Sequence, residues 1–194
     1  MLYALIILLT MGLDFGLSIP LALVKNTFSL DFAILCPLLS LMFELVLIGL
    51  LDIILHLLPK RLFHYEKRFF VTSKKEIALY NKIGVKKWKS LVPELGASGG
   101  FSKRNLQSVD EKYLERFIWE TCFGEVLHLC SAILGFFVIF CFDLRYFYIS
   151  LPIAVVNFAL NLLPCFIQRY NRHKLVVVLQ FAKRRNQSGQ AFRN

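Results

Sequence analysis

Four long runs of apolar residues constrain this chain more than any other feature of its sequence. They cover residues 2–24, 32–58, 123–142 and 146–167. Each run is long enough to cross a hydrocarbon layer of about 30 Å as a helix rising about 1.5 Å per residue. Since hydrophobic residues make up 57% of the 194, the sequence predicts an all-α integral membrane protein with about four transmembrane helices.

Two strongly basic segments alternate with these runs. Residues 59–121 carry 14 lysines and arginines against 7 acidic residues, and residues 169–194 carry 7 basic residues and no acid. The two short turns carry one basic residue each, Lys25 and Arg145. Basic segments that flank membrane helices stay in the cytoplasm. We therefore expect two transmembrane helices in residues 1–58, a cytoplasmic loop at 59–121, two more helices in residues 122–168, a cytoplasmic tail at 169–194, and both termini inside the cell.

The central loop is too rich in aromatic side chains to be a simple linker. Aromatic residues interleaved with lysine and arginine near a membrane border are typical of a segment seated among anionic headgroups. Within the loop, residues 76–83 fit a short amphipathic helix closed by Gly84. Asp110 can cap a further helix that begins at Glu111. Residues 92–100 contain the proline and glycines of an irregular loop.

The net charge of +10 belongs mostly to these two segments, which lie beside predicted membrane helices. Charge in that position attracts anionic lipid. The lipid bilayer is therefore the expected partner, and no nucleic acid is expected.

Three ionisable side chains meet where the basic loop runs into the third apolar run: Glu120, Glu125 and His128. At about 100° per residue, one helix face can hold all three. Ionisable groups at or inside a bilayer are costly, which makes them candidates for a functional site. The alternative is that Glu120 pairs with a neighbouring cation at the interface while His128 hydrogen-bonds another helix.

Two further polar pairs lie within apolar runs. Asp52 and His56 are spaced i, i+4 and adjoin on one helix face, and Asn157 and Asn161 have the same spacing. Both pairs are secondary candidates for substrate contact. Hydrogen bonds that join neighbouring helices in the bundle explain the asparagines equally well and are the favoured interpretation for Asp52 and His56.

Motifs for metals and nucleotide cofactors are missing from the sequence. Glu125 and His128 match one half of a di-iron carboxylate motif, but the second half has no counterpart. There is no phosphate-binding glycine loop and no His-Glu-x-x-His. We therefore expect neither a metal nor a cofactor.

Four ordered motifs in this chain resemble those of the glycosyl-4,4'-diaponeurosporenoate acyltransferases, small bacterial membrane proteins of carotenoid-pigment synthesis. They are residues 80–89 (YNKIGVKKWK), residues 101–106 (FSKRNL), Glu120-Thr121 followed by residues 125–128 (EVLH), and residues 168–172 (QRYNR). The resemblance covers residues 80–185. The chain departs from the family in its N-terminal third, where the second run carries Glu44, Asp52 and His56.

The resemblance implies a multi-pass protein of the bacterial cell membrane that transfers a fatty acyl group to a sugar hydroxyl of a membrane glycolipid. Such a reaction needs a base for the hydroxyl proton and an orienting group for that base. His128 fits the base, with Glu125 or Glu120 beside it. The donor is acyl-CoA or an acyl carrier protein. The substrate-binding candidates are Lys86, Lys87, Trp88, Lys89, Lys103, Arg169, Tyr170, Asn171 and Arg172.

A non-catalytic membrane protein is the competing hypothesis. A four-helix protein whose basic loop and tail bind anionic lipid or a pathway partner would explain the charge and the aromatic residues without chemistry at His128.

Overall fold

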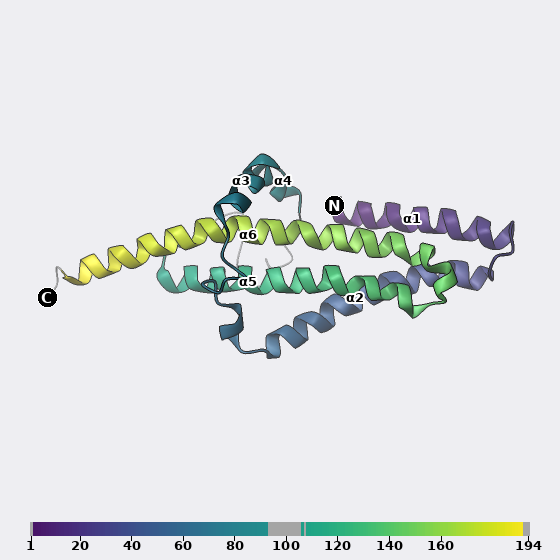
Figure 1. Ribbon diagram of the computed structural model, residues 1–194, viewed down its shortest axis with the longest axis horizontal. Helices are drawn as coiled ribbons and strands as arrows, with labels where there is room; N and C mark the ends of the chain where they lie inside the picture. Colours follow the sequence, from purple (N-terminus) through teal and green to yellow (C-terminus); the bar gives the residue numbers. More distant parts are fainter. Residues whose placement is uncertain (1, 93–105, 107, 192–194) are drawn as a thin grey trace. The chain divides into compact units, whose positions relative to one another are not determined.

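The computed structural model describes residues 2–92, 106 and 108–191, and the regular structure of these residues is entirely helical (Figure 1). This confirms the predicted all-α fold. The chain forms two compact units, and each unit takes segments from both halves of the sequence. The first unit contains Met1–Leu57 and Leu127–Leu163, and the second contains Leu58–Val126 and Pro164–Asn194.

The first unit is built from the apolar helices. It contains α1 (Leu2–Leu23), α2 (Leu30–Leu57), the end of α5 (Glu111–Leu134), η4 (Gly135–Cys141), η5 (Leu144–Tyr146) and the start of α6 (Phe147–Ala191). Helices α1 and α2 lie side by side (Figure 1), and Ser18 Oγ donates to the carbonyl of Ala33 at 2.8 Å. Many leucines of both helices face outward; Leu8, for example, is 68% exposed. An outward apolar surface of this kind suits contact with lipid tails.

Four helical segments are long and apolar enough to cross a membrane: Leu2–Leu23, Leu30–Leu57, Glu111–Cys141 and Leu144–Ser188. The predicted number of membrane-spanning helices is therefore confirmed, and the protein is a membrane protein. Helix α6 tolerates Pro152 and Pro164 in its interior, as membrane helices do when neighbouring groups satisfy the freed carbonyls.

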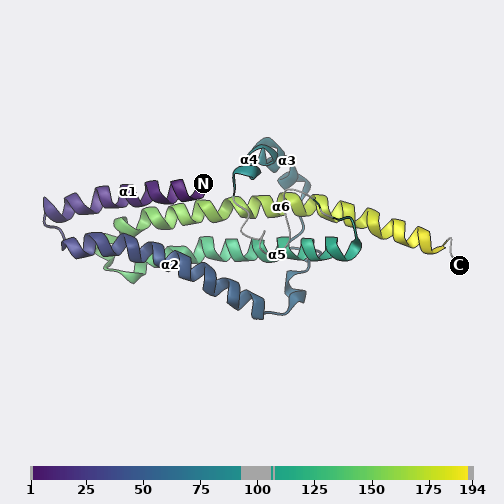
Figure 2. The same cartoon turned by 180° about the vertical axis from the view of Figure 1, so that it is seen from behind.

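The second unit contains the basic segments. Its short helices are η1 (Lys60–Phe63), α3 (Lys74–Lys82), α4 (Val85–Trp88) and η2 (Lys89–Leu91). Helices α3 and α4 lie against α6 in both views (Figure 2), and the rings of Tyr80 and Phe166 are 5.8 Å apart. These two helices of the basic loop are thus packed onto a long helix, in agreement with the aromatic content of the loop.

Two helices of this unit begin at capped ends, and α3 begins at Lys74, two residues before the predicted start at Glu76. Ser73 Oγ accepts from the backbone NH of Glu76 at 3.2 Å, and Glu76 Oε2 accepts from the NH of Ser73 at 2.7 Å. This reciprocal pair is a capping box, and Gly84, with φ of 68°, follows the helix end. Asp110 Oδ2 accepts from the backbone NH of Lys112 at 3.1 Å, so Asp110 caps α5 as expected.

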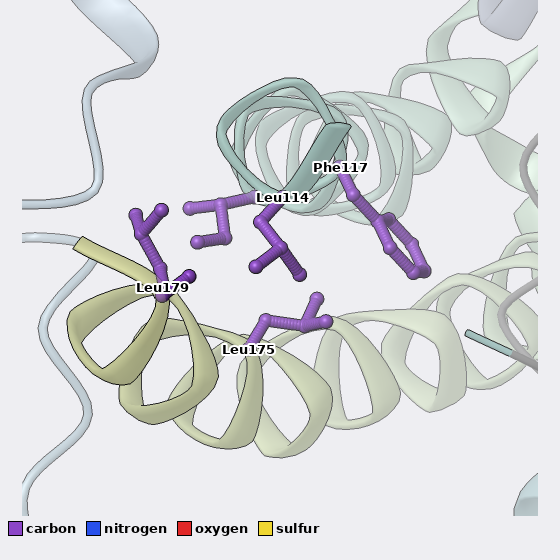
Figure 3. Close-up of a cluster of buried hydrophobic side chains, with 6 residues drawn as sticks. Leu114, Phe117, Leu175 and Leu179 are labelled. Atoms are coloured by element: carbon purple, nitrogen blue, oxygen red, sulfur yellow. The ribbon is translucent and has the colours of Figure 1, made fainter. Parts of the chain in front are cut away.

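Helices α5 and α6 extend well beyond the apolar runs that predicted them. Helix α5 already begins at Glu111, and α6 continues to Ala191 through the segment expected to be a tail. The reason is a buried apolar cluster between the two helices (Figure 3). Its buried members are Leu114, Phe117, Ile118, Leu175, Leu179 and Ala182. Their spacing of three and four residues puts them on one face of each helix, so the polar ends of both helices pack together.

Candidate functional site

The carboxylate of Glu125 is the centre of a buried ionic network in the second unit. Nη1 of Arg169 donates to Oε1 of Glu125 at 2.6 Å, and Nη2 of Arg172 donates to Oε2. The two arginines are one helical turn apart on α6, so both reach the same side of α5. Glu125 is only 2% exposed and Arg172 only 1%. Their charges are therefore compensated inside the unit rather than by water.

Every nitrogen of the Arg172 guanidinium has a partner. Nε donates to the carbonyl of Phe70 at 3.1 Å, and Nη1 donates to Sγ of Cys122 at 3.3 Å. The guanidinium also lies over the ring of Phe70, 5.2 Å from its centroid, within the range of a cation–π contact. Phosphate binding by Arg172, as the sequence hypothesis supposes, would require this enclosed ion pair to open.

Arg169 links the network to helix α3. Its Nη2 lies 2.9 Å from Oε1 of Glu76, and its Nη1 also donates to the carbonyl of Phe69 at 3.1 Å. Partial burial by itself raises the pKa of Glu76, but hydrogen bonds from Ser73 and the charge of Arg169 hold the pKa below its ordinary value. With two carboxylates and two guanidiniums, the network is neutral.

The sequence hypothesis missed Glu76 as a partner of Arg169. The capping box Ser73-x-x-Glu76 was visible as a local pattern and could have marked the start of α3. It carries no information about Arg169, which lies 93 positions further along the chain.

A second group of predicted substrate-binding residues surrounds Tyr170. Lys89 Nζ donates to Oδ1 of Asn171 at 3.2 Å and lies 5.9 Å from the ring centroid of Tyr170. Lys174 Nζ donates to the Tyr170 hydroxyl at 2.7 Å. The structure thus brings Lys89, Tyr170 and Asn171 together.

Three of the other predicted substrate-binding residues lie on α4, just before Lys89 in the chain. Trp88 donates from Nε1 to the carbonyl of Ile83 at 3.1 Å. Lys86 and Lys87 are exposed on α4. Lys103 lies outside the described residues.

His128 belongs to the first unit, where Nδ1 lies 2.9 Å from Oδ1 of Asn161. Asn161 Nδ2 donates to Oδ1 of Asn157 at 2.7 Å. The two asparagines, predicted as a pair on one helix face, therefore meet each other and His128. The orienting group at Nδ1 is an amide, whereas the sequence hypothesis expected a carboxylate.

The remaining candidates are more exposed. Nδ1 of His56 lies 3.5 Å from Oδ1 of Asp52 and 2.8 Å from the backbone carbonyl of Asp52. Their side chains are 55% and 47% exposed, so the predicted i, i+4 pair forms on the outer face of α2. Glu120 is partly exposed on α5. Among the residues described, no cluster of three or more His, Cys, Asp or Glu side chains forms a metal site.

Gly124, next to Glu125, is closely approached by the side chain of Gln168. A methyl group built at Gly124 would lie 2.9 Å from Nε2 of Gln168, and Gln168 is buried. We expect Gly124→Ala to destabilise the protein by about 1–3 kcal/mol, because the amide must be displaced from a packed position. Reversible unfolding of the purified protein in mixed micelles measures this loss.

Gly49→Ala is the matched control for that substitution. Gly49 lies within α2, and a methyl group built there meets nothing within 4 Å. Since alanine favours a helix over glycine by about 1 kcal/mol, this variant should be neutral or slightly more stable. Equal effects of the two substitutions would contradict the close approach of Gln168.

Comparison with known proteins identifies a family. A family model described as glycosyl-4,4'-diaponeurosporenoate acyltransferase matches residues 59–180. This range contains Glu76, Glu125, His128, Arg169 and Arg172. No curated protein and no solved structure matches the chain.

Proposed function

Because this chain belongs to the glycosyl-4,4'-diaponeurosporenoate acyltransferase family, it is an acyltransferase, and we propose that it moves a fatty acyl group onto a sugar hydroxyl of a membrane glycolipid. The observation that carries the proposal is the extent of the family match, which covers more than half of the chain and includes both the Glu125 network and His128. The four apolar helices suit an acceptor that is dissolved in the bilayer.

The proposed chemistry is ester formation from a thioester donor. His128 takes the proton of the acceptor hydroxyl as its oxygen attacks the acyl carbonyl carbon. The carbon–sulfur bond of the donor then breaks, and the departing thiolate receives the proton from the imidazolium. The products are an O-acyl sugar and a free thiol, so atoms and charge balance.

The donor is proposed to be acyl-CoA or an acyl carrier protein, bound through the cations of the second unit. Lys86 and Lys87 are exposed on α4 and available to phosphate groups or acidic side chains. Lys89 lies beside Tyr170 and Asn171. Arg172 is proposed to act differently: it holds Glu125 in place and thereby fixes α5 against α6 within this unit. Glu120 remains a candidate for direct participation in catalysis.

We also propose an orientation of the protein in the membrane, from the distribution of its basic residues. Most of the basic residues lie in residues 59–121 and 169–194. Such residues are retained on the cytoplasmic side of a bacterial cell membrane. Both termini and the donor-binding lysines are then in the cytoplasm. Acyl thioesters, the proposed donors, are made in the same compartment.

A lipid analysis tests the function. Cells that make a glycosylated carotenoid ester are supplied with an isotope-labelled fatty acid, with and without the protein, and their lipids are compared by mass spectrometry. We expect a glycolipid heavier by one acyl group, labelled, and present only with the protein. Lipids unchanged by well-expressed protein would contradict the proposal and favour the non-catalytic, lipid-binding alternative. Isolated membranes given labelled acyl-CoA or labelled acyl carrier protein then separate the two donors.

A further inference from the structure

We propose that a chain of two amides, Asn157 and Asn161, fixes the tautomer of His128, so that Nδ1 carries the proton and Nε2 is the nitrogen that accepts the substrate proton. This inference rests on the proposed function only in taking His128 as the base. All of the residues that carry it lie in the first unit.

The backbone carbonyl of Ser131 determines how the side-chain amide of Asn157 is oriented. Nδ2 of Asn157 donates to the carbonyl oxygen of Ser131 at 3.1 Å. A carbonyl oxygen can only accept, so the amide nitrogen of Asn157 must face it. A flipped Asn157 would place two acceptors against each other. The side-chain oxygen of Asn157 must therefore point the other way.

The orientation of the Asn157 side chain in turn determines that of the Asn161 side chain. Nδ2 of Asn161 donates to Oδ1 of Asn157 at 2.7 Å and also to the backbone carbonyl of Asn157 at 3.0 Å. A flipped Asn161 would turn its oxygen toward two acceptors. The side-chain oxygen of Asn161 is therefore the atom that faces His128.

The side-chain oxygen of Asn161 determines the protonation of the His128 imidazole at Nδ1. Nδ1 of His128 lies 2.9 Å from Oδ1 of Asn161, and an amide oxygen has no proton to donate. Nδ1 must then be the donor. In a neutral imidazole only one ring nitrogen carries a proton, so Nε2 carries the lone pair. Asn157 and Asn161 are thus positioning residues for the base.

Close packing against Gly135 holds the side-chain amide of Asn157 in place. A methyl group built at Gly135 would lie 2.6 Å from Oε2 of Glu44 and even closer to Nδ2 of Asn157. Gly135 therefore lets the Asn157 amide reach the Ser131 carbonyl. Asn161 is buried, at 7% exposed, and Asn157 is half-buried. Because each side-chain amide is hydrogen-bonded to the next group, a flip of either one would break these bonds, and both keep one orientation.

Substitutions of Asn161 separate a positioning role from simple packing. Asn161→Leu keeps the volume but removes the acceptor for Nδ1–H, so we expect kcat to fall about tenfold or more with KM little changed. Asn161→Asp, in its protonated form, can donate to Asn157 and accept from His128, and it should retain most of the activity. If Asn161 only packed between helices, leucine would be tolerated better than a buried aspartic acid.

Nitrogen NMR on the wild-type protein tests the tautomer directly. The protein is labelled with ¹⁵N-histidine and reconstituted in lipid nanodiscs. The spectrum of His128→Gln identifies the His128 signals, and that of His64→Gln, at an exposed position, serves as the matched control. We expect neutral His128 to be protonated at Nδ1 in the wild type, with this preference lost in Asn161→Leu.

The outcomes distinguish this inference from the proposed function. Protonation of the wild type at Nε2, or wild-type kcat in Asn161→Leu, would overturn the positioning role even if His128→Gln is inactive. Full activity of His128→Gln would instead overturn His128 as the base. The NMR measurement needs no folded variant of Asn161, so it decides the tautomer in either case.

Discussion

Replacing His128 by glutamine is expected to lower kcat for acyl transfer by about 10²–10⁴-fold, the usual contribution of a positioned general base. The loss corresponds to about 3–5 kcal/mol of activation free energy. Glutamine is close to histidine in size and can still hydrogen-bond Asn161, so the helix contact at this point is kept. The measurement is the rate of labelled-acyl transfer by purified protein in nanodiscs, together with KM for the donor.

His64→Gln is the control for that substitution. His64 is an exposed histidine of the second unit that pairs with Glu66 at 3.7 Å. This variant should have wild-type kcat. If His128→Gln were within about threefold of the wild type, a different group would have to remove the hydroxyl proton, and Glu120 would be the next candidate.

Replacing Arg172 by methionine is expected to destabilise the protein by about 3–5 kcal/mol. The reason is that removal of one partner from a buried ion pair leaves an uncompensated charge, here on Glu125. The carbonyl of Phe70, which accepts from Nε of Arg172 at 3.1 Å, also loses its donor. Arg169 continues to contact Glu125, which favours the lower end of this range. Reversible unfolding in mixed micelles gives the change in the free energy of unfolding.

A second substitution identifies the origin of that loss. Adding Glu125→Gln to Arg172→Met removes the unpaired charge, so the double variant should recover part of the lost stability. Arg185→Met, at an exposed position of the same helix, is the matched control and should change stability by less than about 0.5 kcal/mol. If Arg172→Met behaved like Arg185→Met, the buried ion pair would not stabilise the unit.

The five polar residues 168–172 make contacts on more than one side of helix α6. Consecutive side chains of a helix point in directions about 100° apart, so a run of polar residues covers the whole circumference. Gln168 lies against Gly124, while Arg169 and Arg172 bind Glu125. Tyr170 and Asn171 contact Lys174 and Lys89 respectively. Helix α6 is thus in contact with α5 and with Lys89 at this level, and these contacts give polar partners to a motif that is mostly buried.

The sequence by itself determined the features that depend on neighbouring residues. Apolar runs long enough to span a bilayer predicted the four membrane helices, because helix length and hydrophobicity are local quantities. Gly84 and Asp110 likewise marked helix boundaries correctly, since a cap acts within one turn. The spacing of Asn157 and Asn161 predicted that they share a face, and they do.

Only the tertiary structure decided which polar groups meet. Glu125 could have oriented His128, but the structure gives its carboxylate to two arginines 44 and 47 residues away. An amide 33 residues away faces Nδ1 of His128. The extension of α5 and α6 was decided in the same way, because Leu114 and Leu175 stabilise helical ends only when they pack together. Contacts between distant residues depend on how whole helices pack, and no local pattern of residues contains that information.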